Sequence, residues 1–203
     1  MVTLSEPVDR SLADNLTNID SGALIDNSAP ALVLPQKSLL LFNETDQERT
    51  AATTLLVIDP SSYSQVMTEP LLSEETPADA FTRLNEENVI LTEPIANTLD
   101  VDVGTIIQLR YVNYTEIVIP VVTPNGTSFL TKIVPVPAWV NFTVIGIVQG
   151  AFMETVSVGS FSLADTCYVA YDILNDTFPQ YMDNATMFFI KSKANQDLQL
   201  IEE

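Results

Sequence analysis

Two runs of β-branched and apolar residues, 116–122 and 128–136, stand on either side of Pro124, Asn125 and Gly126. An Asn-Gly pair readily takes the positive φ values that a tight hairpin turn demands. β-Branched residues in turn pack well on a pleated strand. The segment therefore predicts an antiparallel hairpin, and it requires β-structure in the fold.

Strand and helix signals alternate through the middle of the chain. Residues 54–58 form a continuous aliphatic run of strand length, after which Asp59 and Pro60 suit the N-cap and first position of a helix through residue 66. The run 88–91 predicts the next strand, and Thr92 to Pro94 repeat the cap-then-proline order. Further strands are predicted at residues 31–34, 38–42, 105–111, 142–148, 156–161, 167–171 and 187–190, with 156–161 pairing with 142–148. Further helices are predicted from Thr76, the expected N-cap, through Leu84, between residue 171 and Pro179, and from Gln196 to Glu203.

These signals together predict an α+β fold with mixed or antiparallel sheets and short helices. The chain has 203 residues, of which 46% are hydrophobic, enough for one substantial core or two small cores that share an interface. The richest apolar stretch, residues 133–148, is broken by Pro135, Pro137 and Asn141. We therefore expect no membrane span within this sequence.

The charge balance limits the partners. There are 27 acidic and 8 basic residues, a formal net charge of -19, and the acids are spread along the chain without a long block. Nucleic acids and anionic headgroups are bound by clustered Lys and Arg. We therefore expect no nucleic-acid partner and no peripheral binding to anionic membranes.

The residue inventory excludes most catalytic chemistry. Without histidine, histidine-dependent triads, imidazole base catalysis and histidine zinc sites are impossible. No phosphate-cradling glycine motif is present, and residues 100–104 lack the later ligands of a calcium loop. The single thiol, Cys167, lies in an apolar run and is expected in the core. We expect no cofactor, no metal and no catalytic centre, although 27 acids leave a glycosidase-like carboxylate pair open.

The sequence is rich in Asn-X-Ser/Thr sequons, the acceptors of Asn-linked glycans. Such a density favours an outward-facing location, and with no possible disulfide it fits a surface protein of a glycosylating archaeon. An Asn- and Thr-rich composition also produces sequons by chance. The candidate sites are Asn15, Asn43, Asn113, Asn125, Asn141, Asn175 and Asn184. Asn43, Asn125 and Asn184 have the most loop-like neighbours, whereas the alternative for Asn141 is a position that faces into a sheet, where no glycan fits.

Residues 89–105, reading Val-Ile-Leu-Thr-Glu-Pro-Ile-Ala-Asn-Thr-Leu-Asp-Val-Asp-Val-Gly-Thr, resemble a segment of the outer domains of MacB/FtsX-like permeases. Three further pieces follow the order of that family: residues 57–60, 142–148 and 168–171. The likeness covers residues 55–193. The chain departs from the family at Thr105, where aspartate is common, and in a longer segment between Tyr111 and Trp139.

The resemblance implies an extracytoplasmic domain of an FtsX/MacB/LolC-type ABC transporter permease, set between two transmembrane helices on the outer face of the cell membrane. It implies a membrane-proximal lobe from residues 1–58 and 165–203, and an inserted β-rich lobe from 59–164. The partners would be the transmembrane helices of the same permease, a cytoplasmic subunit that hydrolyses ATP, and a second permease copy. The domain would contact substrate or partner and transmit motion. A structural or adhesive surface glycoprotein is the alternative.

Overall fold

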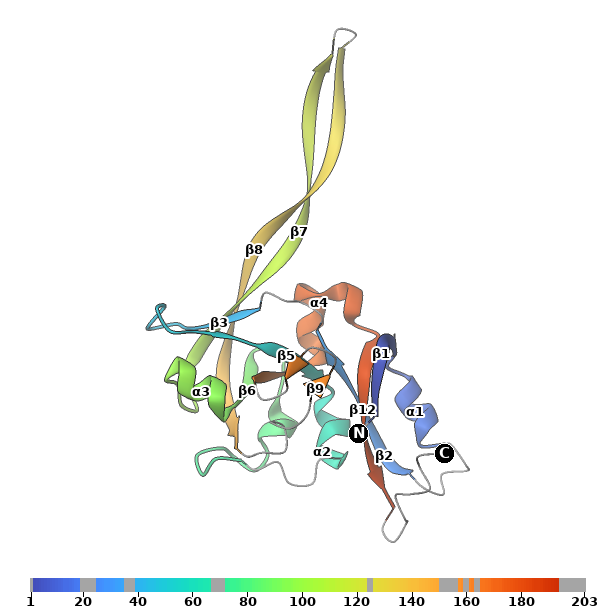
Figure 1. Cartoon of the computed structure of the whole chain (residues 1–203), viewed down its shortest axis with the longest axis vertical. Helices are drawn as coiled ribbons and strands as arrows, with labels where there is room; N and C mark the ends of the chain where they lie inside the picture. Colours follow the sequence, from blue (N-terminus) through green and yellow to red (C-terminus); the bar gives the residue numbers. More distant parts are fainter. Residues whose placement is uncertain are drawn as a thin grey trace.

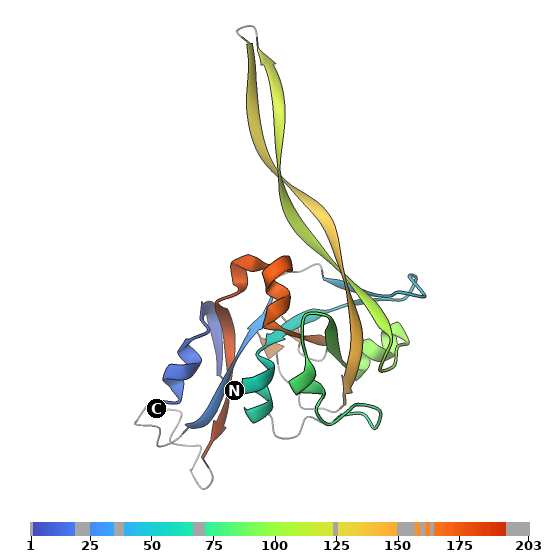
Figure 2. The same ribbon diagram turned by 180° about the vertical axis from the view of Figure 1, so that it is seen from behind.

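The computed structural model describes residues 2–18, 25–34, 39–66, 72–123, 126–149, 157–158, 161–162 and 165–193. A ten-stranded mixed sheet is flanked by short helices, and one long hairpin projects from it (Figures 1 and 2). The predicted α+β class is confirmed. The predicted helix from Gln196 lies outside the described residues.

The elements are short apart from the two strands of the hairpin. The strands are β1 (Val2–Asp9), β2 (Ile25–Val33), β3 (Leu40–Asn43), β4 (Thr50–Ala52), β5 (Thr54–Ile58), β6 (Asn88–Thr92), β7 (Ile106–Thr123), β8 (Gly126–Val148), β9 (Ser157–Val158), β10 (Phe161–Ser162), β11 (Thr166–Ala170) and β12 (Asn184–Ser192). The helices are α1 (Leu12–Leu16), α2 (Pro60–Val66), α3 (Glu93–Leu99) and α4 (Leu174–Thr177), with 3₁₀ turns η2 (Ala80–Arg83), η4 (Tyr171–Ile173) and η5 (Pro179–Tyr181).

The strand order of the main sheet is β1-β12-β2-β5-β11-β6-β8-β7-β3-β4. Two neighbouring pairs, β5–β11 and β6–β8, are parallel, and the other pairs are antiparallel. Every residue of β5 and β11 is buried. Their unbroken apolar runs fit this position, because a central strand is covered on both faces. Cys167 lies in β11, fully buried, and burial raises the pKa of its thiol.

The helices divide between the two faces of the sheet. Leu55 and Leu91 point to the face covered by α3 and α4, where Leu99 and Leu174 complete a buried cluster. The neighbouring residues Leu56 and Ile90 point to the opposite face, together with Tyr63 of α2 and Phe81 of η2. Alternate residues of each central strand therefore supply two cores on one sheet.

The helix start predicted at Asp59 is confirmed. Its Oδ1 accepts hydrogen bonds from the backbone N–H groups of Ser61 and Ser62, both at 2.9 Å. Burial alone would raise the pKa of Asp59, but these bonds and the Ser61 hydroxyl hold the pKa below its ordinary value. The carboxylate is thus kept charged at the positive end of α2.

The caps predicted at Thr76 and Thr92 are wrong in their mechanism. The Thr76 hydroxyl accepts a hydrogen bond from the Ile147 backbone N–H at 2.8 Å, and only the 3₁₀ turn η2 follows. The Thr92 hydroxyl donates to the Thr166 carbonyl oxygen at 3.2 Å, although α3 begins where predicted. Both hydroxyls tie neighbouring segments to the sheet instead of closing a helix turn.

Several predicted strands differ in extent or partner. The strand predicted at 105–111 and the first strand of the predicted hairpin form one continuous strand, β7. The second hairpin strand and the strand predicted at 142–148 likewise form one strand, β8. The segment around residue 157 pairs as β9 with β10, not with β8. Neither β1 nor α1 was expected from the polar N-terminal region.

The two ends of the described chain lie side by side. β1 and β12 are antiparallel neighbours, with Val2 opposite Phe188 and Asp9 opposite Asn184. The start of β1 and the end of β12 therefore point toward the same end of the sheet. Figure 1 shows the hairpin projecting from the opposite end. Within the described residues no helix combines the length and the apolarity that crossing a bilayer requires.

Gly146 lies at an irregularity in β8, where the register with β6 shifts between Val89 and Ile90. A Cβ at Gly146 would come within 2.8 Å of Thr76 Cγ2 and 3.3 Å of Ala80 Cβ. We expect Gly146→Ala to lower the free energy of unfolding by about 1–3 kcal/mol through overpacking, measured by urea denaturation.

The second variant, Gly146→Ala with Thr76→Ser, removes the Cγ2 atom and keeps the hydroxyl that bonds Ile147. It should recover part of the loss. If Gly146→Ala is as stable as the wild type, the close approach of Thr76 does not constrain this position.

Candidate functional site: the projecting hairpin

Strands β7 and β8 pair without a break from Ile106 opposite Thr143 to Thr123 opposite Gly126. At the base the pair belongs to the main sheet, since β3 adjoins β7 as far as Arg110 and β6 adjoins β8 from Thr143. Beyond these points the two strands pair only with each other among the described residues. They form a twisted ribbon that stands away from the body (Figure 2).

The base of the ribbon is fixed in the core. Leu109 and Phe142 are buried there, and the Tyr111 ring meets Phe178 edge to face with ring centroids 5.0 Å apart. Burial, and then the nearby Asp176 carboxylate, raises the pKa of the Tyr111 phenol. Tyr111 therefore stays neutral and acts as an aromatic anchor between the ribbon and the segment after α4.

The ribbon exposes many large apolar side chains. Residues 112–140 contain only two charged residues, Glu116 and Lys132, so the entire net charge of -19 lies outside them. An exposed apolar surface of this extent marks an interaction site. The exposed apolar side chains of the ribbon are Tyr114, Ile117, Val118, Ile119, Val121, Val122, Phe129, Leu130, Ile133, Val136 and Trp139.

The two faces of the ribbon are not equivalent. Residues directly opposite in the register share a face. The Phe129 face comprises the even-numbered residues of β7 from Val112 to Val122 with their partners on β8. It holds the five most exposed large apolar side chains of the described structure, between 61% and 84% exposed: Tyr114, Val118, Val122, Phe129 and Ile133. The opposite, Leu130 face holds Ile117, Ile119, Val121, Leu130 and Val136, at 37% to 56%.

Three prolines protect the edges of the ribbon. Pro120 lies in β7, and Pro135 and Pro137 of β8 lie opposite Tyr114 and Val112 of β7. All three prolines therefore belong to pairs whose β7 residue has an even number. In an antiparallel pair, alternate residues direct their N–H groups away from the partner strand, and proline has no N–H to offer. The three prolines therefore fit the outward-directed positions and interrupt both edges. These positions disfavour the addition of a strand at either edge and leave the two faces of the ribbon as its available surfaces.

A compact polar–aromatic group lies where the ribbon leaves the sheet. Phe42 of β3 meets Trp139 of β8 with ring centroids 5.4 Å apart. The Arg110 guanidinium carbon lies 5.6 Å from the Phe42 ring centroid and 5.9 Å from that of Trp139. This cation–π arrangement joins β3, β7 and β8 at the base of the Phe129 face.

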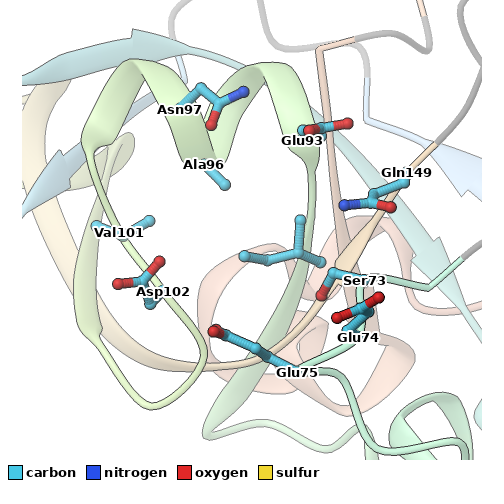
Figure 3. A pocket seen from close by; sticks show the side chains of 10 residues that line it. Ser73, Glu74, Glu75, Glu93, Ala96, Asn97, Val101, Asp102 and Gln149 are labelled. Carbon is cyan, nitrogen blue, oxygen red and sulfur yellow. The ribbon is translucent and has the colours of Figure 1, made fainter.

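A second surface feature is a pocket between α3, the segment before η2 and the end of β8 (Figure 3). The carboxylates of Glu74, Glu75, Glu93 and Asp102 border it from different sides. Such a rim disfavours anions. In the described part of the chain, no group of three or more Asp, Glu, His or Cys residues is placed to hold a metal ion.

Four of the seven sequon asparagines are exposed: Asn15 in α1, Asn113 in β7, Asn141 in β8 and Asn175 in α4. Asn184 in β12 is half-buried, and Asn125 lies outside the described residues. The Asn141 side chain does not point into the sheet. Its Oδ1 accepts a hydrogen bond from Gln108 Nε2 at 3.0 Å, at the surface.

Asn43 is different from the other sequon residues. It is buried, and its Nδ2, the atom that would carry a glycan, donates to the Leu99 carbonyl oxygen at 3.0 Å. Its Oδ1 accepts from the backbone N–H of Thr45 at 3.0 Å. In the folded protein Asn43 therefore holds a loop to the end of α3 and offers no free amide for modification.

The sequence predicts the hairpin but not its exposure. The turn signal at Asn125 and Gly126 indicates the pairing, and the segment between Tyr111 and Trp139 is longer than the resemblance implies. The functional signal was its composition: a stretch of β-branched residues almost free of charge within a strongly acidic chain.

An α+β domain with adjacent ends and one projecting hairpin is the class that this fold defines. No family model matches the chain, and no curated protein matches it. Among solved structures it is similar to the periplasmic region of MacB from Actinobacillus actinomycetemcomitans, with a TM-score of 0.53 and 13% sequence identity. The match covers 96% of this chain and 69% of that one. The chain thus has the fold of the MacB periplasmic region.

Because the Phe129 face is exposed, polar substitutions there should not reduce stability. We expect Phe129→Ser and Ile133→Ser to change the free energy of unfolding by less than about 0.5 kcal/mol and to lower the binding of a hydrophobic dye. Leu109→Ala, at the buried base, should cost about 2–5 kcal/mol. A large loss of stability in the first two variants would mean that the face is covered within the monomer.

The sequons can be tested separately. In protein isolated from its natural host, glycopeptide mapping should find glycans among Asn15, Asn113, Asn141 and Asn175, and none on Asn43, whose amide is buried and bonded. A glycan on Asn43 would show that modification precedes folding of this region. If the intact mass of the natural protein shows no glycan, the sequons no longer support an outward-facing location.

Proposed function

We propose that the chain is the extracytoplasmic domain of an ABC-type permease. In this proposal it contacts a substrate or partner through the β7–β8 hairpin and moves when ATP hydrolysis in a separate subunit drives the membrane helices. The shared fold with the periplasmic region of MacB supports this function. Because one fold can serve many functions, the proposal rests mainly on where the chain ends and the hairpin lie in the domain.

The observation that carries it is the placement of the chain ends. Val2 at the start of β1 and Ser192 at the end of β12 point to one end of the sheet, and the hairpin projects from the other. A domain set between two membrane helices needs both ends on its membrane side. In that orientation the hairpin reaches away from the membrane toward a partner.

The body supplies a rigid connection between these two regions. β12 and β1 are linked through β2, β5, β11 and β6 to β8, by a continuous hydrogen-bonded sheet with a core on each face. From Tyr111 to Thr123 the ribbon extends about 40 Å at the usual rise per residue. A small rotation of the sheet would therefore move the hairpin tip by several times the shift at the membrane end.

The division into lobes remains part of the proposal. The strands β1, β12, β2, β5 and β11 are consecutive in the sheet and come from residues 1–58 and 165–203, the expected membrane-proximal lobe. β6, β8 and β7 follow from the expected inserted lobe, 59–164, although β3 and β4 from the first part lie beyond them. In the proposal the boundary falls between β11 and β6.

The partners follow from the same proposal. The sequence has no phosphate-binding loop, so nucleotide hydrolysis would belong to a cytoplasmic ATPase subunit. The transmembrane helices would be those of the same permease. The domain itself would carry no catalytic centre.

A structural or adhesive surface glycoprotein is the second candidate, favoured by the exposed sequons Asn15, Asn113, Asn141 and Asn175. One experiment separates the two. The natural full-length protein is purified from its host membranes with an antibody to this domain, and the co-purifying proteins are identified by mass spectrometry. The permease proposal predicts a stoichiometric subunit whose peptides contain a phosphate-binding loop and whose ATPase activity is retained.

Protease added to intact cells provides the control for location and should remove the domain. Recovery of the protein without any ATPase subunit, in a form anchored by a single segment, would overturn the permease proposal in favour of the surface glycoprotein.

A further inference from the structure

We propose that two copies of this chain pair through the Phe129 faces of their hairpins. The inference rests on the proposed role of the hairpin as a contact surface, and it names the occupant of that surface. Because the ribbon twists, the Phe129 face winds around it (Figures 1 and 2). Two identical ribbons can therefore wrap around each other along matching faces.

The size of the face fits a specific but weak contact. Its five most exposed apolar side chains present roughly 600 Å² of accessible surface, which is at the upper limit for a patch on an ordinary monomer. A face-to-face pair would bury about 1,200 Å² in total, the lower end of the range for specific interfaces. Such a contact becomes strong when both copies are held in one membrane, through their effective concentration.

Charge is scarce on the Phe129 face, where Glu116, opposite Ile133, is the one charged residue between Val112 and Val122 and their partners, and this fits a partner identical to itself. In a two-fold symmetric contact each patch meets its own copy, so a charge near the axis would face the same charge. The tip half of the Phe129 face carries none: its positions are Val118, Pro120, Val122, Thr127, Phe129 and Thr131. Complementary charges, which select a different partner, are absent there.

Two other modes of contact fit less well. Pro120, Pro135 and Pro137 interrupt the ribbon edges, so neither another hairpin nor a peptide can extend the sheet there. The proposed orientation directs the tip away from the membrane that holds the domain, which leaves no lipid surface of that membrane within its reach. Face-to-face stacking of two ribbons remains.

Electrostatics gives the pairing a recognisable signature. Each copy carries a net charge of -19, all of it outside residues 112–140, so the bodies repel while the ribbons do not. Salt screens this repulsion, with a Debye length of about 8 Å at physiological ionic strength. Pairing through the hairpins should therefore strengthen as salt increases, whereas binding to a cationic partner would weaken.

The test is sedimentation equilibrium of the 203-residue chain at up to about 1 mM, in about 0.05 M and 0.5 M NaCl. We expect a monomer–dimer equilibrium that shifts toward dimer at the higher salt. Phe129→Asp should weaken the dimer by at least about tenfold, because it places a charge near the axis. The matched control Leu130→Asp, the next residue but on the other face, should change it by less than about threefold.

Cysteine crosslinking provides an independent readout, since Cys167 is buried. Phe129→Cys should form a disulfide-linked dimer under mild oxidation much faster than Leu130→Cys, after correction for the alkylation rate of each thiol. A wild type that is monomeric at both salt concentrations, or an equal loss in both aspartate variants, would overturn the pairing. A monomeric chain whose full-length protein still co-purifies with an ATPase would leave the proposed permease function intact.

Discussion

The uninterrupted pairing of β7 with β8 is the constraint on which the other features depend. Its lower part supplies two strands of the main sheet, and Leu109, Tyr111 and Phe142 bury this part in the core. Among the described residues its upper part has no neighbouring strand, and an isolated two-stranded ribbon is marginally stable by itself. The ribbon keeps its direction because the same two strands continue into a covered sheet. Through this continuity, the acidic body holds out an apolar surface that is almost free of charge.

Much of the fold could be predicted from local signals. The aliphatic run before Asp59 and the Asn125-Gly126 turn gave β5, α2 and the hairpin, because each combines a strand pattern with a specific cap or turn. Thr76 and Thr92 misled because a threonine hydroxyl serves a helix cap and a sheet contact equally well in sequence. β1 was missed because it is an edge strand with an irregular register, and Glu6, Pro7 and Asp9 interrupt its apolar pattern. The pairing of β9 with β10 joins adjacent segments of the chain, whereas the sequence predicted a pairing of this segment with 142–148.

The candidate site was predictable only in part. The sequence contains the low charge of residues 112–140, but apolar β-branched runs are equally typical of a buried strand. Whether such a run is covered depends on its neighbours, and β3 and β6 end their pairing near Arg110 and Thr143. The sequon pattern has the same limitation: Asn43 and Asn113 look alike in sequence, and they are distinguished by the burial of Asn43 and its hydrogen bond to Leu99. Charge and motif therefore favour an outward-facing protein, and the three-dimensional arrangement shows which apolar surface is exposed.

The most direct test is whether the hairpin behaves as a rigid extension of the sheet. Spin labels on Glu86→Cys in the body and Ser128→Cys near the tip, both at exposed positions, would report the distance between them by pulsed electron spin resonance. Cys167 is buried and should remain unlabelled. A rigid ribbon predicts a single narrow distance distribution at a dilution where the chain is monomeric. A broad distribution would show that the upper ribbon moves independently of the sheet, and would contradict transmission of motion from the body to the tip.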